Sequence, residues 1–182
     1  MIMRTSLLVL AVAGLVACEP PEGPNTTKPA PTNAPMATAS ATVKIASNRT
    51  LTPDARAAMK QQLGGEGGKK AWILSQPGNP EVAALVTSLT EVFKDAGWEV
   101  QADTVSGMTL KPGLMTLVAE EQYPPYVEGV LKALEASGLD AKSASGYRGY
   151  YESKKQENPS WPGVPIRADQ DFVIVVGPRP TA

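Results

Sequence analysis

Residues 71–103, AWILSQPGNPEVAALVTSLTEVFKDAGWEVQAD, decide the fold that this sequence predicts. The apolar run at 71–74 is typical of a buried strand. Asn79-Pro80-Glu81 then supplies a cap, a first-turn proline and a first-turn acid, and apolar residues recur at steps of three and four until Gly97. Residues 98–103 alternate between apolar and polar as a half-buried strand does. The segment therefore predicts a strand, a helix and a strand joined by a right-handed crossover.

A second segment of the same kind begins at residue 114. LMTLVA at 114–119 predicts a strand, and a helix should begin at Pro124 or Pro125 and end at Gly138. The apolar stripe of this helix consists of Val127, Val130, Leu131 and Leu134. The sequence thus contains an approximate repeat of one strand-helix unit.

The remaining elements complete one domain. FVIVV at 172–176 is apolar on both faces, which is typical of a central strand. Thr52-Pro53-Asp54 predicts a helix that ends near Leu63. All ten aromatic residues lie at or after Trp72, so we expect the folded part to span residues 50–182. The prediction is a single small α/β domain with a four- to five-stranded sheet and two to three helices, in a two-layer or small three-layer sandwich.

The first 18 residues have the pattern of an export signal. Arg4 is followed by an apolar stretch at 7–17, which is shorter than the ~20 residues that span a bilayer. This stretch closes on Leu15-Val16-Ala17-Cys18, which resembles the lipobox of a bacterial lipoprotein. The resemblance implies that residues 1–17 are removed and that Cys18 carries lipid, which attaches the protein to a membrane of the bacterial cell envelope. The expected place is the periplasmic face of an outer membrane or the outer face of an inner membrane.

Residues 18–49 predict a tether between the lipid and the domain. The stretch is rich in proline, alanine and threonine and holds no aromatic residue. Such a composition buries too little apolar surface to offset the entropy of ordering the chain. We therefore expect a disordered segment that holds the domain clear of the lipid surface.

Composition excludes several kinds of chemistry. The chain has no histidine, which removes Ser-His-Asp and Cys-His catalysis and the commonest transition-metal ligand. Cys18 is the only cysteine, so the domain has no disulfide and no cysteine-based metal cluster. We expect neither a cofactor nor a metal. A net charge of −1 gives no reason to expect a nucleic-acid partner.

One candidate ligand site is a crevice beyond the carboxyl ends of the strands. Gln76, Gly78 and Asn79 lie where the first strand meets a helix N-terminus, whose backbone amides can hold an anion. Glu120 and Glu121 should lie at the same edge if the 114–119 strand runs parallel to the first. Helix capping and solvation account for the same residues without any ligand.

The second candidate is an aromatic and basic surface within residues 142–167. This segment carries five cations and two acids among polar and proline-rich sequence. The residues of the predicted surface are Tyr147, Arg148, Tyr150, Tyr151, Lys154, Lys155 and Trp161. Aromatic rings interleaved with cations can stack on sugars, peptides or bases. The alternative, which we favour, is a strand at 146–153 whose tyrosines cover the sheet, followed by a turn at 158–163.

Two classes of function are consistent with these features. The first is a non-enzymatic, lipid-anchored interaction or ligand-binding module of the envelope, whose partner is an envelope protein or a glycan. A small-ligand version of this module predicts a concave pocket at the strand ends. The alternative is a hydrolase or transferase that uses carboxylates such as Glu120 or Asp103, which requires no histidine. We favour the module because no catalytic residue set is present in the sequence.

Overall fold

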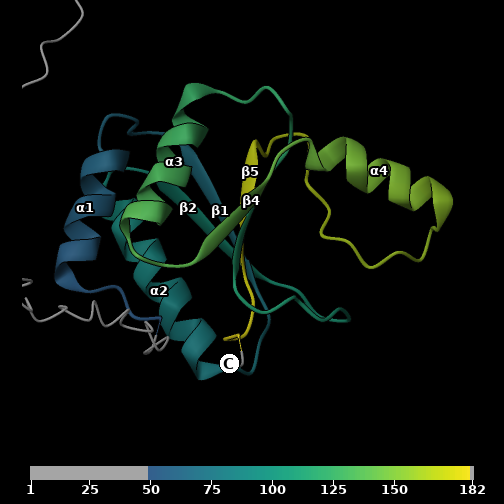
Figure 1. Cartoon of the computed structure of the whole chain (residues 1–182), viewed down its shortest axis with the longest axis horizontal. Helices are drawn as coiled ribbons and strands as arrows, with labels where there is room; N and C mark the ends of the chain where they lie inside the picture. The colour runs from purple at the N-terminus through teal and green to yellow at the C-terminus, as the bar shows by residue number, and fades with distance from the viewer. Residues whose placement is uncertain (1–48, 181–182) are drawn as a thin grey trace, which may run out of the picture. The chain divides into compact units, whose positions relative to one another are not determined.

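The computed structural model describes residues 49–180, and five strands in this range pair into one mixed sheet in an α/β domain (Figure 1). The elements in chain order are α1 (Pro53–Leu63), β1 (Lys70–Ser75), α2 (Pro80–Asp95), β2 (Glu99–Thr104), β3 (Leu114–Val118), α3 (Pro125–Ala136), β4 (Ala141–Ala144), α4 (Tyr147–Glu157) and β5 (Phe172–Val176). The predicted fold class is confirmed. The predicted signal peptide, the lipidated Cys18 and nearly all of the tether lie outside the described residues.

The repeated strand-helix unit predicted from the sequence is present in each half of the sheet, and in both halves a parallel strand completes it. β1, α2 and β2 form the first unit, in which the two strands pair in parallel from Lys70 opposite Glu99 to Ser75 opposite Thr104. β3, α3 and β4 form the second unit, again with parallel strands. The strand order is β2-β1-β5-β3-β4, so β5 lies between the two units.

β5 gives the sheet its mixed character. It pairs in parallel with β1 and antiparallel with β3, so the second unit runs opposite to the first. All five of its residues are buried, which confirms the predicted central strand. Phe172, Ile174 and Val176 face one core cluster, whereas Val173 and Val175 face another.

The first core cluster lies between the sheet and three helices. Two crossovers of the same hand place their helices on the same face when both the strand direction and the direction of travel across the sheet are reversed, as they are between these two units. α2 and α3 do lie on one face (Figure 1). α1 packs mainly on α3 and also on α2. The largest fully buried side chains of this cluster include Phe93, Met59, Leu85, Leu89 and Leu134.

The second core cluster lies on the opposite face of the sheet, which we call the loop-covered face. Segments 105–112 and 158–171 cover this face together with the first turn of α4. The buried members of the cluster are Trp72, Leu110, Leu117, Val164, Val173 and Val175. Figure 1 shows α4 and the segment that returns from it to β5 on this side.

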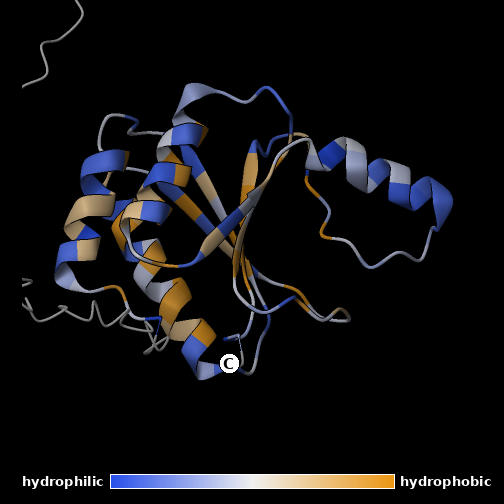
Figure 2. Cartoon of the chain, viewed as in Figure 1, coloured by the Kyte–Doolittle hydropathy of each residue, from blue (hydrophilic) through white to orange (hydrophobic). Residues whose placement is uncertain are grey.

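The strand that we predicted at 146–153 is a helix, and this corrects the preferred interpretation of that segment. α4 has no buried residue and is mostly hydrophilic (Figure 2). Tyr147, Tyr150 and Tyr151 are spaced three and four residues apart, so a helix places them on one side, where they contact one another and Trp161. The high strand propensity of tyrosine was misleading because this segment is not part of the sheet.

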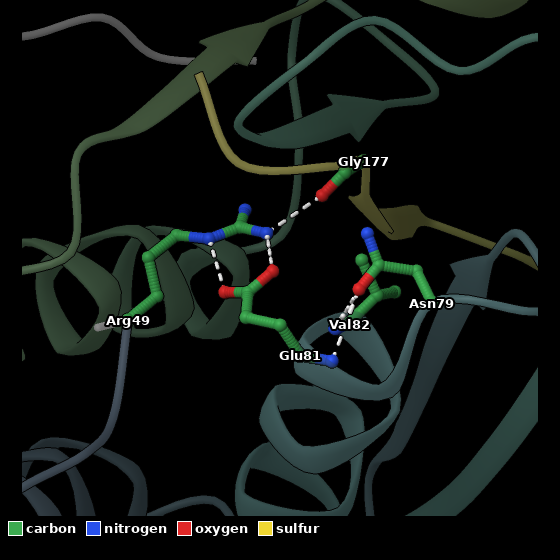
Figure 3. Close-up of polar contacts among 5 residues, drawn as sticks. All are labelled: Arg49, Asn79, Glu81, Val82 and Gly177. Carbon is green, nitrogen blue, oxygen red and sulfur yellow. Dashed lines mark hydrogen bonds and ion pairs between the residues drawn. The ribbon is translucent and has the colours of Figure 1, made fainter. Parts of the chain in front are cut away.

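An ion pair attaches the start of the described chain to the sheet and to α2 (Figure 3). The guanidinium of Arg49 donates to both carboxylate oxygens of Glu81, at 2.8 and 2.6 Å, and to the carbonyl oxygen of Gly177 at 2.8 Å. Beside this pair, Asn79 Oδ1 accepts hydrogen bonds from the backbone amides of Glu81 and Val82, at 3.0 and 3.3 Å. The predicted cap of α2 is confirmed.

Replacing the cap residue tests whether Asn79 stabilises α2. Asn79→Ala removes the acceptor of two backbone amides, and we expect the free energy of unfolding to fall by about 1 kcal/mol. Asn79→Asp keeps an acceptor oxygen at the helix N-terminus and should retain the stability. Urea denaturation followed by circular dichroism measures both variants. Equal stabilities of the alanine and aspartate variants would contradict the capping role.

Candidate functional site

A cavity of about 530 Å³ lies on the loop-covered face of the sheet, over β3 and β4. Its floor consists of Met115 and Leu117 from β3, Val175 from β5 and Ala144 from β4. Residues 108–113 form one wall, and the first turn of α4 with residues 161–164 forms the other. A cleft of this volume with a largely apolar lining is typical of a small-molecule site.

Aromatic rings from α4 and from the segment that follows it form the second wall. Tyr147, Tyr150 and Trp161 line the cavity. The Trp161 ring lies 5.6 Å from the ring of Tyr150 and 5.8 Å from that of Tyr151, measured between centroids. The hydroxyl of Tyr147 accepts a hydrogen bond from the backbone amide of Val164 at 3.2 Å, and burial raises the pKa of Tyr147. The wall is therefore a packed group of rings with a neutral tyrosine at its base.

The cations of the predicted surface hold α4 in place. The Lys154 and Lys155 amines lie 6.0 and 5.8 Å from the ring centroids of Tyr150 and Tyr151. Lys154 also pairs with Glu157 at 2.6 Å. The seven predicted residues thus separate into two groups: three line the cavity, and Arg148, Tyr151, Lys154 and Lys155 stabilise the helix that carries them.

Arg148 connects α4 to the rest of the domain. Its guanidinium donates to the carbonyl oxygens of Arg167 and Gln170, at 3.2 and 3.0 Å, and pairs with Glu120 at 3.2 Å. Glu121 lies against Gly146, whose positive φ of 66° and close contact with that side chain favour glycine. Both glutamates therefore stand at the base of α4.

The crevice predicted beyond the strand ends does not form. β3 runs antiparallel to β5, and β5 runs parallel to β1, so the carboxyl ends of β1 and β3 lie at opposite ends of the sheet. Glu120 and Glu121 are therefore far from the end that carries Gln76, Gly78 and Asn79. The condition that the two strands be parallel is not met. The polar groups at the first edge also have internal partners, since Asn79 caps α2 and Gly78, with a φ of 90°, forms the preceding turn.

Gln76 serves the cavity indirectly. Its side chain donates to the carbonyl oxygen of Met108 at 2.6 Å and accepts from the backbone amide of Leu110 at 3.1 Å. These two bonds hold the 108–110 segment, which forms one wall of the cavity. The structure thus assigns Gln76 a positioning role.

The carboxylates proposed for catalysis lie apart. Asp103 is exposed on β2, where it accepts a hydrogen bond from Gln101, and Glu120 follows the end of β3 at the opposite edge of the sheet. The Glu120 side chain is 58% exposed. Neither carboxylate lies in a closed cleft, so Asp103 and Glu120 do not form the catalytic pair that a carboxylate-dependent enzyme would need. Within residues 49–180 no three acidic or cysteine side chains are placed to hold a metal ion.

A tyrosine and an aspartate form a close pair outside the cavity. The hydroxyl of Tyr126, at the start of α3, donates to Asp171 just before β5, and the Lys69 amine lies 4.8 Å from the centroid of the Tyr126 ring. Burial and the bond to Asp171 raise the pKa of Tyr126. Tyr126 therefore stays protonated near neutral pH and fastens α3 to the central strand.

The wall formed by residues 108–113, and the lysines that line the cavity, could not be predicted from the sequence. Met108, Leu110 and Lys111 precede β3 in a segment without periodicity, and only the tertiary fold brings them opposite Tyr147. Lys142 counts among the cations of the 142–167 segment, but its position on β4 places it on the floor of the cavity. Pro112-Gly113 predicts a turn, but a turn signal does not say which part of the fold the turn will face.

Compared with protein-family models, curated proteins and solved structures, the chain gives no match. None of the helices within residues 49–180 combines the length and the apolar character that crossing a membrane requires. The case for a function therefore depends on the geometry of the cavity.

Two glycines offer a matched test of the aromatic wall. A Cβ at Gly163 would lie 1.8 Å from Cζ3 of Trp161, so Gly163→Ala forces the ring out of its place between the tyrosines. We expect a loss of about 1–3 kcal/mol in the free energy of unfolding, because the added methyl overpacks the wall. A Cβ at Gly149 in α4 meets no atom within 4 Å, and Gly149→Ala should stabilise the helix by about 0.5–1 kcal/mol.

Denaturation curves and tryptophan fluorescence measure the two glycine variants. The Gly163 variant should change the emission of Trp161, and the Gly149 variant should leave it unchanged. The proposed packing would be wrong if both substitutions were tolerated equally.

Proposed function

We propose that this chain is a lipid-anchored ligand-binding protein of the bacterial cell envelope, and that its ligand occupies the cavity over β3 and β4. The single observation that carries the proposal is the aromatic wall of Tyr147, Tyr150 and Trp161 beside a floor of apolar side chains. Flat, exposed rings and apolar side chains bind organic ligands by excluding water. The cavity lies on the face of the sheet and not at the strand ends, where we expected it.

The size of the cavity favours a small molecule. A volume of about 530 Å³ lies within the usual range of about 300–1,000 Å³ for ligand pockets. A folded protein partner generally makes a flat contact of much larger area. A small organic ligand is therefore the occupant that this geometry supports best.

Binding without catalysis is favoured by the groups that line the cavity. Asp140 is the one carboxylate among the described lining residues, and acid-base chemistry of the glycosidase kind needs two. The Tyr147 hydroxyl is held neutral by burial and bonded to Val164, so it is a poor proton acceptor. These groups can orient a ligand.

Residues on the two faces of β4 provide a test of the site. Ala144 is exposed on the floor of the cavity, whereas its neighbour Ser143 points to the other face of the sheet. A tryptophan at 144 would extend from the floor into the cavity without entering the core. Ala144→Trp should therefore weaken ligand binding at least tenfold, and Ser143→Trp should leave it within about twofold.

The neutral dye N-phenyl-1-naphthylamine, whose fluorescence rises in apolar surroundings, is the probe for this test. Residues 19–182 hold both core clusters, which lie within 51–176, and leave out the predicted signal and Cys18. Dye titration of the wild type and both variants gives the dissociation constants. If the wild type fails to bind the dye, or if all three proteins bind it equally, the proposed site is wrong.

The lipid anchor is tested on the full chain. The match of Leu15-Val16-Ala17-Cys18 to a lipobox supports cleavage before Cys18 and lipid attachment to its thiol. Mass spectrometry of the protein extracted from bacterial membranes should give an N-terminal peptide that starts at a diacylglyceryl-modified Cys18. Cys18→Ser should release the protein from the membrane fraction. An unmodified Cys18 thiol in the membrane-extracted protein would show that the anchor is absent.

A further inference from the structure

Charged side chains gather at one end of the cavity and aromatic rings at the other. Lys111, Asp140 and Lys142 line the end where β3 and β4 begin, since Leu114 pairs with Ala141 there. Tyr147 and Tyr150 follow the end of β4 and line the opposite end. The cavity is therefore polar at one end and aromatic at the other.

The two lysines at the polar end are unpaired within residues 49–180. Neither Lys111 nor Lys142 has a carboxylate oxygen within 4.0 Å, although Asp140 lines the same cavity. Lys154 on α4 is by contrast paired with Glu157. Two ammonium groups against one carboxylate leave an excess of positive charge at this end.

The fold holds both lysines beside apolar floor residues. Lys142 lies opposite Met115 in the β3–β4 register, so its aliphatic stem runs along the floor of the cavity. Lys111 is carried by the segment that leads into β3, and its carbonyl oxygen closely approaches Gly177, where a Cβ would lie only 1.8 Å away. The backbone that presents Lys111 is thus fixed against the end of β5.

We propose that the ligand is a small amphipathic anion, with an apolar or aromatic body against Tyr147, Tyr150 and Trp161 and one anionic group between Lys111 and Lys142. This inference rests on the proposed ligand-binding function and specifies the chemistry of the ligand. The available volume equals that of about 18 water molecules in the liquid, which suits a body of two or three rings or a medium acyl chain. The partly exposed lysines contribute selectivity for the anion, and the apolar walls contribute most of the affinity.

Two dyes with the same body separate charge from apolar binding. 1-Anilinonaphthalene-8-sulfonate carries a sulfonate, and N-phenyl-1-naphthylamine has the same rings without it. We expect residues 19–182 to bind the sulfonate at least fivefold more tightly than the neutral dye. This preference should decline between 20 and 500 mM salt, because salt screens charges near the surface.

Charge variants locate the preference in the protein. Lys111→Gln with Lys142→Gln should weaken binding of the sulfonate about tenfold and leave the neutral dye within twofold. Asp140→Asn removes the one opposing carboxylate and should strengthen sulfonate binding about threefold. The matched control is Lys60→Gln with Lys94→Gln, which removes the same charge from exposed positions on α1 and α2 and should change neither affinity.

The possible outcomes distinguish this inference from the proposed function. If both dyes bind equally and Ala144→Trp blocks both, the cavity binds ligands but the anion preference is wrong. An equal loss of sulfonate affinity in the control pair would also overturn it, because the effect would then come from net charge. If neither dye binds, the proposed function itself fails.

Discussion

The pairing of β5 with β1 on one side and β3 on the other is the constraint on which the rest of the structure depends. β5 is parallel to one neighbour and antiparallel to the other, so it joins two strand-helix-strand units that run in opposite directions. Its five buried residues contribute side chains to both core clusters. Because both crossovers have the same hand, this arrangement places α2 and α3 on one face.

The opposite face is covered mainly by loop segments, together with the first turn of α4, and this difference creates the site. α1, α2 and α3 pack on the other face of the sheet, so Leu110 and Val164 cover this face from two separate loops. The loops do not fill the space over β4, and a cavity of about 530 Å³ remains between the loops and the strand. The rings of Tyr147, at the start of α4, and of Trp161, in the segment that follows it, close one side of the cavity. The fold and the site thus have a common origin in the one-sided placement of the helices.

Local patterns predicted the elements well and their mutual directions poorly. The cap at Asn79 and the stops at Gly97 and Gly138 act through neighbouring residues, so the bounds of α2 and α3 follow closely from the sequence. The prediction of a strand at 146–153 was wrong, because the spacing of tyrosines and glycines does not show whether a segment joins a sheet, and this one forms a helix. The crevice at Gln76 and Glu120 depended on strand direction, which no local pattern determines, and it proved not to form.

By itself the sequence determined an α/β class, a repeated strand-helix unit, a buried last strand and a chain without histidine. These properties depend on periodicity, caps and composition, which act over a few residues. Only the tertiary structure decided that β5 runs antiparallel to β3, and that Lys111 and Lys142 share a cavity with Tyr147. The physical reason is that such contacts join residues far apart in the chain, and their direction is chosen by the packing of the whole core.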